Sequence, residues 1–146
     1  AGAPNINLNF YQDIIKNKNV FIIKNETYAL LSNSKASLVT SGTATLEASI
    51  FRIPQVVCYK TSFISYFLAK IFVKIKFISL VNLIMDEEII KELIQSKCSK
   101  QNIIKELKKV LDLEKRYNLM SKYDKLISLL GSSGSSKRVA KDIVVK

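Results

Sequence analysis

The chain has 146 residues, enough for one ordinary domain, and its content of 48% apolar and 24% charged residues excludes disorder over most of its length. Its 23 basic and 12 acidic residues give a formal charge of +11, which favours polyanionic partners: nucleic acid, nucleotide phosphates or an anionic membrane. The sequence has no histidine, so a serine–histidine triad or a histidine-ligated metal within this chain is excluded, and Cys58 and Cys98 are expected to be reduced thiols in no metal or redox spacing.

The first part of the chain is predicted to alternate strands with helices. In chain order we predict a helix at residues 9–17, a strand at 20–23, a helix at 28–31, a strand at 37–40, a helix at 45–51 and a strand at 55–59. Because the strands are continuous apolar runs, they favour a parallel sheet that is covered by crossover helices on both faces. This pattern predicts a Rossmann-like α/β fold.

The second part of the chain is predicted to be mainly helical. A strongly apolar helix at residues 62–75 and a strand at 77–80 are followed by helices at 87–95, 100–111 and 113–130. The serine- and glycine-rich residues 131–136 are predicted to form a flexible hinge before a last helix at 137–145. We therefore expect one domain over residues 1–146, with a parallel sheet followed by a helical C-terminal region. The start of the chain lacks the features of a signal peptide and an initiating methionine, which is expected either of a piece of a longer protein or of a mature processed terminus.

Candidate binding residues lie where the strand at 37–40 meets the next helix, because ligands of parallel sheets bind beyond the carboxyl ends of strands. Gly42 permits a tight turn and a close approach of an anion. The hydroxyls of Ser41 and Thr43, together with the free N–H groups of the helix start, are suited to phosphate oxygens. Glu47, one turn after Thr43, is suited to ribose hydroxyls. The alternative is a plain N-cap followed by a surface acid.

Several short segments resemble the lipid-A-disaccharide synthase family. They occur in the order and at about the intervals of that family, at residues 41–47 (SGTATLE), 54–59 (PQVVCY), 68–70 (LAK), 78–82 (ISLVN) and 91–95 (KELIQ). Residues 3–5 and 27–28 also look like the family. The resemblance runs from the first residues to about residue 95, and more loosely to the end of the chain.

The resemblance implies a GT-B glycosyltransferase, in which two Rossmann-like domains face each other across a cleft. Such an enzyme transfers 2,3-diacylglucosamine from UDP-2,3-diacylglucosamine to lipid X (2,3-diacylglucosamine 1-phosphate) and releases UDP. This chain matches the C-terminal, nucleotide-binding half. The residues implied to bind the nucleotide are those on the donor-loop motif and one later asparagine: Ser41, Gly42, Thr43, Thr45, Glu47 and Asn82.

The resemblance also implies what this chain lacks. The family's general-base aspartate lies in an N-terminal domain that is not part of this sequence, so the chain is expected to be inactive alone, with that domain as its partner. No metal or other cofactor is expected, and helix N–H groups would stabilise the departing diphosphate. The family usually has proline before the asparagine at position 82, whereas this chain has Val81, which puts the local turn in doubt.

The predicted helix at 62–75 combines aromatic and basic residues in a stretch without acids. It is too short and too charged to span a bilayer, but a helix of this kind can lie in an anionic membrane interface. The alternative is that the aromatic residues are core and the lysines only solvated. With the acylated substrates that the family implies, we expect a cytoplasmic protein peripheral to the inner face of the inner membrane. The expected contacts are Phe63, Tyr66, Phe67, Lys70 and Lys74.

Two other functions remain as alternatives. A non-enzymatic nucleic-acid-binding domain is suggested by the charge of +11, although no known RNA- or DNA-binding motif is present and we expect no nucleic acid partner. Another UDP-sugar enzyme of the same architecture, such as the peptidoglycan glycosyltransferase or a sugar-nucleotide epimerase, shares the donor-site logic. The segments at 78–82 and 91–95 point away from it.

Overall fold

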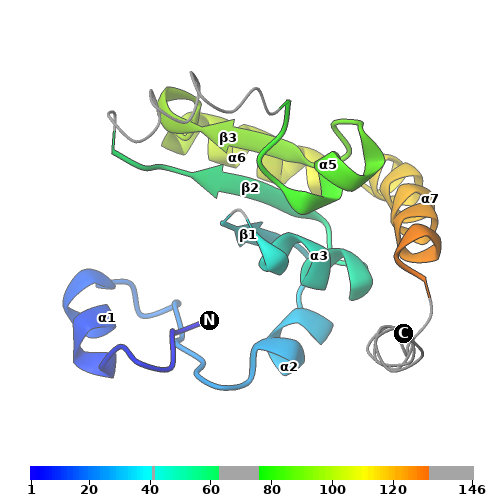
Figure 1. Ribbon diagram of the computed structural model, residues 1–146. Coiled ribbons are helices and arrows are strands. Elements are labelled where there is room, and N and C mark those ends of the chain that lie inside the picture. Colours follow the sequence, from blue (N-terminus) through cyan, green and yellow to red (C-terminus); the bar gives the residue numbers. More distant parts are fainter. Residues whose placement is uncertain (41, 63–75, 132–146) are drawn as a thin grey trace, which may run out of the picture.

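Figure 1 shows the computed structural model, which describes residues 1–40, 42–62 and 76–131. Helices and strands alternate along most of this length. In chain order the elements are α1 (Leu8–Ile14), α2 (Thr27–Ser32), β1 (Ser37–Val39), α3 (Thr43–Ile50), β2 (Gln55–Tyr59), α5 (Leu80–Met85), β3 (Lys91–Ile94), the 3-10 turn η1 (Gln95–Lys97), α6 (Lys100–Val110) and α7 (Leu113–Leu130).

The described strands form one parallel sheet in the order β1-β2-β3. In the register, Val39 of β1 lies beside Val57 of β2, and Tyr59 of β2 lies beside Ile94 of β3. The central strand β2 has the most buried side chains, because Val56 and Val57 have no exposed surface. The parallel pairing confirms the prediction of a Rossmann-like α/β sheet with crossover helices, followed by a helical region.

Helices cover the sheet from both sides. Helix α3 contacts β1 and β2 and packs against α5 and α7, while α6 contacts β2 and β3. Figure 1 shows α5 in front of the sheet and α6 behind it. The main apolar cluster between these layers consists of Val57, Val81, Ile90, Tyr123 and Leu126. Burial of each such side chain contributes about 1.5–3 kcal/mol, so the α3–α5–α7 layer is held mainly by this cluster.

A buried polar cluster ties α3, β2 and α7 together. The Gln55 side-chain amide donates to the Thr45 carbonyl (2.9 Å), the Ser49 hydroxyl (3.0 Å) and the Tyr123 hydroxyl (3.2 Å). The Tyr123 hydroxyl in turn donates to the Ile53 carbonyl at 3.3 Å. Burial raises the pKa of Tyr123 to about 12 from its ordinary value of 10.0. Side chains of β2 and α7 thereby hold helix α3 against the sheet.

The ionisation of Tyr123 makes a prediction about stability at high pH. Between pH 10 and 12 the tyrosine ionises in the unfolded chain but resists ionisation in the fold, so its stabilising contribution is present below pH 10 and is lost as the pH rises through 12. This shift amounts to about 3 kcal/mol. Tyr123→Phe should be about 1 kcal/mol less stable than wild type at neutral pH. Urea denaturation from pH 8 to 12 should show the variant becoming the more stable protein. Parallel stability curves for the two proteins would contradict the prediction.

Three predicted elements are wrong. Residues 20–23 form no strand, and this region has only an isolated parallel bridge between Gly2 and Lys24. Residues 77–80 form no strand either, because Ser79 caps α5 by accepting a hydrogen bond from the Asn82 N–H at 3.3 Å. Within the predicted helix 87–95, residues Lys91–Ile94 are strand β3 instead. Short apolar runs fit either state, and here pairing with β2 decides between them.

The remaining predictions agree with the structure in type, with shifts of a few residues at the ends. The shift that matters is that α3 begins at Thr43, two residues earlier than predicted, directly at the turn. Beyond Ser62 and Gly131, the predicted helices at 62–75 and 137–145 and the predicted hinge at 131–136 lie outside the described residues. The membrane-contact residues Phe63, Tyr66, Phe67, Lys70 and Lys74 lie outside them as well.

Candidate nucleotide-binding site

The turn between β1 and α3 has the backbone shape that only glycine readily adopts. Gly42 has φ 119° and ψ −156°, a region that a side chain would make strained. It is the N-cap residue of α3, and within the described part of the chain no side chain caps that helix end. A Cβ built on Gly42 would meet no atom of the described residues beyond its chain neighbours within 4 Å, so these residues leave the space beside Gly42 open. The N–H groups at the start of α3 therefore face an open turn, as an anion site requires.

The other predicted residues of the turn fall into two groups. Thr43 is exposed and Glu47 is half-buried one helical turn later, and the Glu47 carboxylate has no partner among the described residues. Thr45 is fully buried, and its hydroxyl donates to the Gly42 carbonyl at 2.8 Å. Thr45 thus shapes the turn instead of offering its hydroxyl to a ligand. Ser41 lies outside the described residues.

Asn82 was expected beside the nucleotide, and the structure places it in the interior. Its side-chain amide donates to the Ile90 carbonyl (2.8 Å) and to Glu92 Oε1 (2.9 Å), while its Oδ1 accepts from the N–H groups of Ile89 (2.8 Å) and Ile90 (3.0 Å). The residue has no exposed surface. These bonds use the full hydrogen-bonding capacity of the amide, so a direct contact with a nucleotide would require some of them to break.

Glu92, which the sequence pattern placed on a helix, is the partner that joins two of the family-like segments. It lies on β3 with 8% of its surface exposed. Its Oε1 accepts from the Ser79 N–H (3.0 Å) and hydroxyl (2.7 Å), and its Oε2 accepts from the Ile78 N–H (2.9 Å). The segments 78–82 and 91–95 are therefore one hydrogen-bonded unit. The sequence signal that could have indicated this buried hydrogen-bonding role is that Glu92 stands among apolar residues, where an acid needs hydrogen-bond partners.

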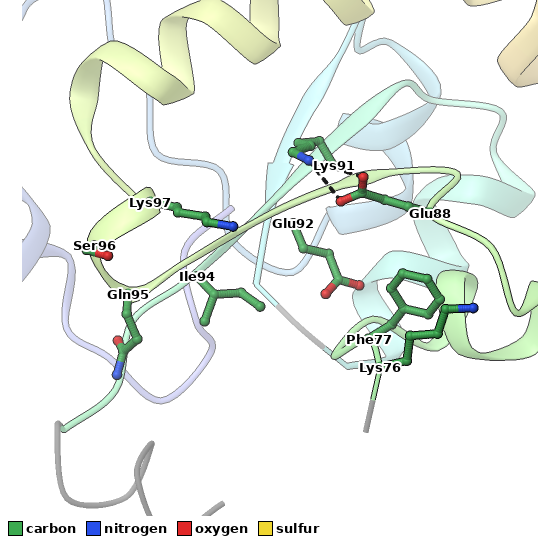
Figure 2. Close-up of a pocket in the computed structure, with 9 residues that line it drawn as sticks. All are labelled: Lys76, Phe77, Glu88, Lys91, Glu92, Ile94, Gln95, Ser96 and Lys97. Carbon is green, nitrogen blue, oxygen red and sulfur yellow. Dashed lines mark hydrogen bonds and ion pairs between the residues drawn. The ribbon is translucent and has the colours of Figure 1, made fainter. Parts of the chain in front are cut away.

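A hollow of about 290 Å³ lies along β3 (Figure 2). It is lined by Lys76, Phe77, Glu88, Lys91, Glu92, Ile94, Gln95, Ser96 and Lys97. Most of its charges are already paired: Lys91 with Glu88 at 3.0 Å and Lys76 with Asp86 at 3.1 Å. Because β3 and β1 lie on opposite sides of β2, this hollow is separate from the Gly42 turn.

The two cysteines, far apart in the sequence, are neighbours in space. Cys58 lies on β2 and Cys98 follows η1, and both are free cysteines whose thiols interact with each other. Burial, and secondarily the neighbouring Cys98 thiol, raise the pKa of Cys58 to about 11 from 9.0. Cys58 is accordingly a neutral thiol at physiological pH.

The parallel sheet, its covering helices and the glycine turn at a helix start define a Rossmann-like domain. A family model described as lipid-A-disaccharide synthetase matches residues 5–144. The chain belongs to the lipid-A-disaccharide synthase family. This confirms the resemblance seen in its motifs and removes the other UDP-sugar enzymes as alternatives.

Individual relatives agree with this assignment. The lipid-A-disaccharide synthase of Psychromonas ingrahamii is 44% identical over 87 residues, which are 58% of this chain and 23% of the relative. That of Rickettsia prowazekii is 40% identical over 105 residues, covering 70% and 28%, respectively. That of Persephonella marina is 37% identical over 99 residues, covering 67% and 26%. The chain thus spans about a quarter of the length of the curated relatives it matches.

The described residues offer neither a membrane-spanning helix nor a cluster of metal-binding side chains. Residues 1–40, 42–62 and 76–131 contain no helix long and apolar enough to cross a membrane. The same residues contain no group of three or more histidine, cysteine or acidic side chains that could hold a metal ion.

Proposed function

We propose that this chain supplies the donor-nucleotide site of a lipid-A-disaccharide synthase. In this reaction 2,3-diacylglucosamine is transferred from UDP-2,3-diacylglucosamine to lipid X, and UDP is released. The observation that carries the proposal is the Gly42 turn, where no side chain of the described residues caps the start of α3 beyond the carboxyl end of β1. Family membership supports the choice of sugar nucleotide.

The chemistry divides between this chain and the rest of the enzyme. The acceptor hydroxyl attacks the anomeric carbon of the donor sugar, the bond from that carbon to the UDP oxygen breaks, and a general base takes the hydroxyl proton. In this proposal the N–H groups of Thr43 and Ala44 at the start of α3 stabilise the negative charge that develops on UDP. The base belongs to the facing domain of a GT-B architecture, so this chain alone is expected to be inactive.

Glu47 is proposed to bind the ribose. Its carboxylate lies one helical turn from Thr43 and has no partner among the described residues. Glu47→Gln keeps the shape but loses the charge-assisted hydrogen bonds, which are worth about 1.5–3 kcal/mol. Titration calorimetry should show UDP affinity falling by roughly tenfold or more. Glu26→Gln, an exposed acid before α2, is the matched control and should bind as wild type does. Equal affinities for all three proteins would remove Glu47 from the site.

A peripheral position on an anionic membrane is the second part of the proposal. It is supported by the aromatic and basic residues at 62–75 and by the acylated substrates proposed above. Reversing the charge of Lys70 and Lys74 to glutamate should reduce co-sedimentation with anionic liposomes several-fold, because each cation near the surface contributes about 1 kcal/mol. The same change at Lys105 and Lys108 on α6 is the charge-matched control. Binding reduced equally by both pairs would indicate net charge alone as the cause.

A further inference from the structure

The carboxyl edge of the sheet carries a second loop, which follows β2 just as the Gly42 turn follows the neighbouring strand β1. Strand β1 ends at Val39, level with Val57, so β2 continues past it to Tyr59. The residues that follow, 60–62, therefore lie beyond the carboxyl edge of the sheet, past the level at which β1 ends. Lys60 of this loop is exposed, and its ammonium has no partner in the described part of the chain.

The side chain of Gln95, the residue after β3, holds Thr61 in this second loop. The Gln95 amide brackets the backbone of Thr61: its Nε2 donates to the Thr61 carbonyl at 3.1 Å, and its Oε1 accepts from the Thr61 N–H at 3.1 Å. The last backbone register between the strands is Tyr59 with Ile94. The Gln95 side chain therefore continues the β2–β3 pairing beyond the point where β3 turns away.

Gln95 makes this bracket from an unfavourable backbone conformation. Its φ is +51°, in the left-handed region that costs a side-chain-bearing residue about 1–2 kcal/mol. Glycine would adopt this shape without strain, and asparagine is the more usual non-glycine choice. Glutamine here is explained by the reach of its amide to Thr61, because a shorter side chain cannot bracket the same peptide.

We propose that Gln95 is a positioning residue for the donor site, and that it fixes the loop at 60–62 so that Lys60 binds the diphosphate of the nucleotide sugar opposite the start of α3. The inference rests on the proposed function and extends the donor-nucleotide site from the Gly42 turn to the loop at 60–62. A lysine contributes a point charge to a phosphate without a demand on geometry, but its value depends on where its backbone is held. Without the Gln95 side chain, the backbone of Thr61 loses both of its hydrogen bonds to the residue after β3.

The test is a double-mutant cycle in the full-length enzyme that contains this region. Gln95→Gly removes the bracket yet relieves the backbone strain, so the fold should be retained. We expect Gln95→Gly and Lys60→Ala each to raise the KM for the nucleotide sugar about tenfold, with little change in kcat and an unchanged thermal midpoint. The KM of the double variant should be no higher than that of the more impaired single variant, because Gln95 acts through Lys60. Lys97→Ala, another exposed lysine at this edge, should behave as wild type.

The outcomes separate the inference from the function on which it rests. Fully additive effects, or a wild-type KM for Gln95→Gly, would overturn the inference while leaving the transferase assignment intact. A wild-type enzyme that binds UDP but transfers no sugar would overturn the transferase assignment. The cycle would then be measured as UDP affinity by calorimetry, where the same non-additivity is expected. A wild-type enzyme that does not bind UDP would overturn both proposals.

Discussion

Replacing Asn82 with alanine is expected to lower the free energy of unfolding by about 3–5 kcal/mol. The change removes every bond of a fully buried amide and takes the Asn82 partner away from the Ile90 N–H and the Ile90 carbonyl. A buried polar group without a partner costs about 1–3 kcal/mol. Urea denaturation of wild type and variant measures the difference directly.

The control for this change is Asn102→Ala on α6. Asn102 also donates to a backbone carbonyl, that of Lys97 at 2.9 Å, but this bond lies at the exposed surface. Its loss should cost less than about 1 kcal/mol. If Asn82→Ala unfolded at the urea concentration of wild type and lost only UDP affinity, the direct nucleotide contact that the family resemblance implied would be correct, and the structural role would be wrong.

Gly42→Ala is expected to weaken UDP binding by about a hundredfold. The open space above Gly42 rules out a steric clash as the cause. The reason is instead the φ of 119°, which alanine escapes only by rotating the backbone and turning the first N–H groups of α3 away from the ligand. Loss of two hydrogen bonds to a charged group is worth about 3 kcal/mol or more, which is the stated change in affinity. Calorimetric titration with UDP measures the effect.

Gly131→Ala provides a matched control for strain. Gly131 ends α7 with φ 79°, and a Cβ there would also meet nothing within 4 Å. Both variants should lose about 1–3 kcal/mol of stability, since both force alanine into a positive φ. Only Gly42→Ala should lose affinity for UDP. Equal loss of affinity in the two variants would mean that general destabilisation, and not the turn, governs binding.

Much of the fold follows from local pattern, and its errors have a common cause. The helices at α6 and α7 and the strand β2 have strong periodicity or a clear apolar run, and they lie where the sequence predicts. The segments around Ser79 and Lys91–Ile94 are short and mixed, and their state is decided by partners distant in the sequence. Glu92 is the clearest example, because its carboxylate finds its hydrogen-bond donors, Ile78 and Ser79, only when β3 lies beside the start of α5.

By itself the sequence determined the α/β class, the family and the Gly42 turn, because continuous strands, motif order and a glycine at a helix start are all local properties. Only the tertiary structure decided which of the candidate residues remain available to a ligand. It left Thr43 and Glu47 open, turned Thr45 and Asn82 inward, and brought Gln95 to Thr61. The physical reason is that availability depends on which hydrogen bonds a side chain has already made, and those partners are set by packing between distant segments.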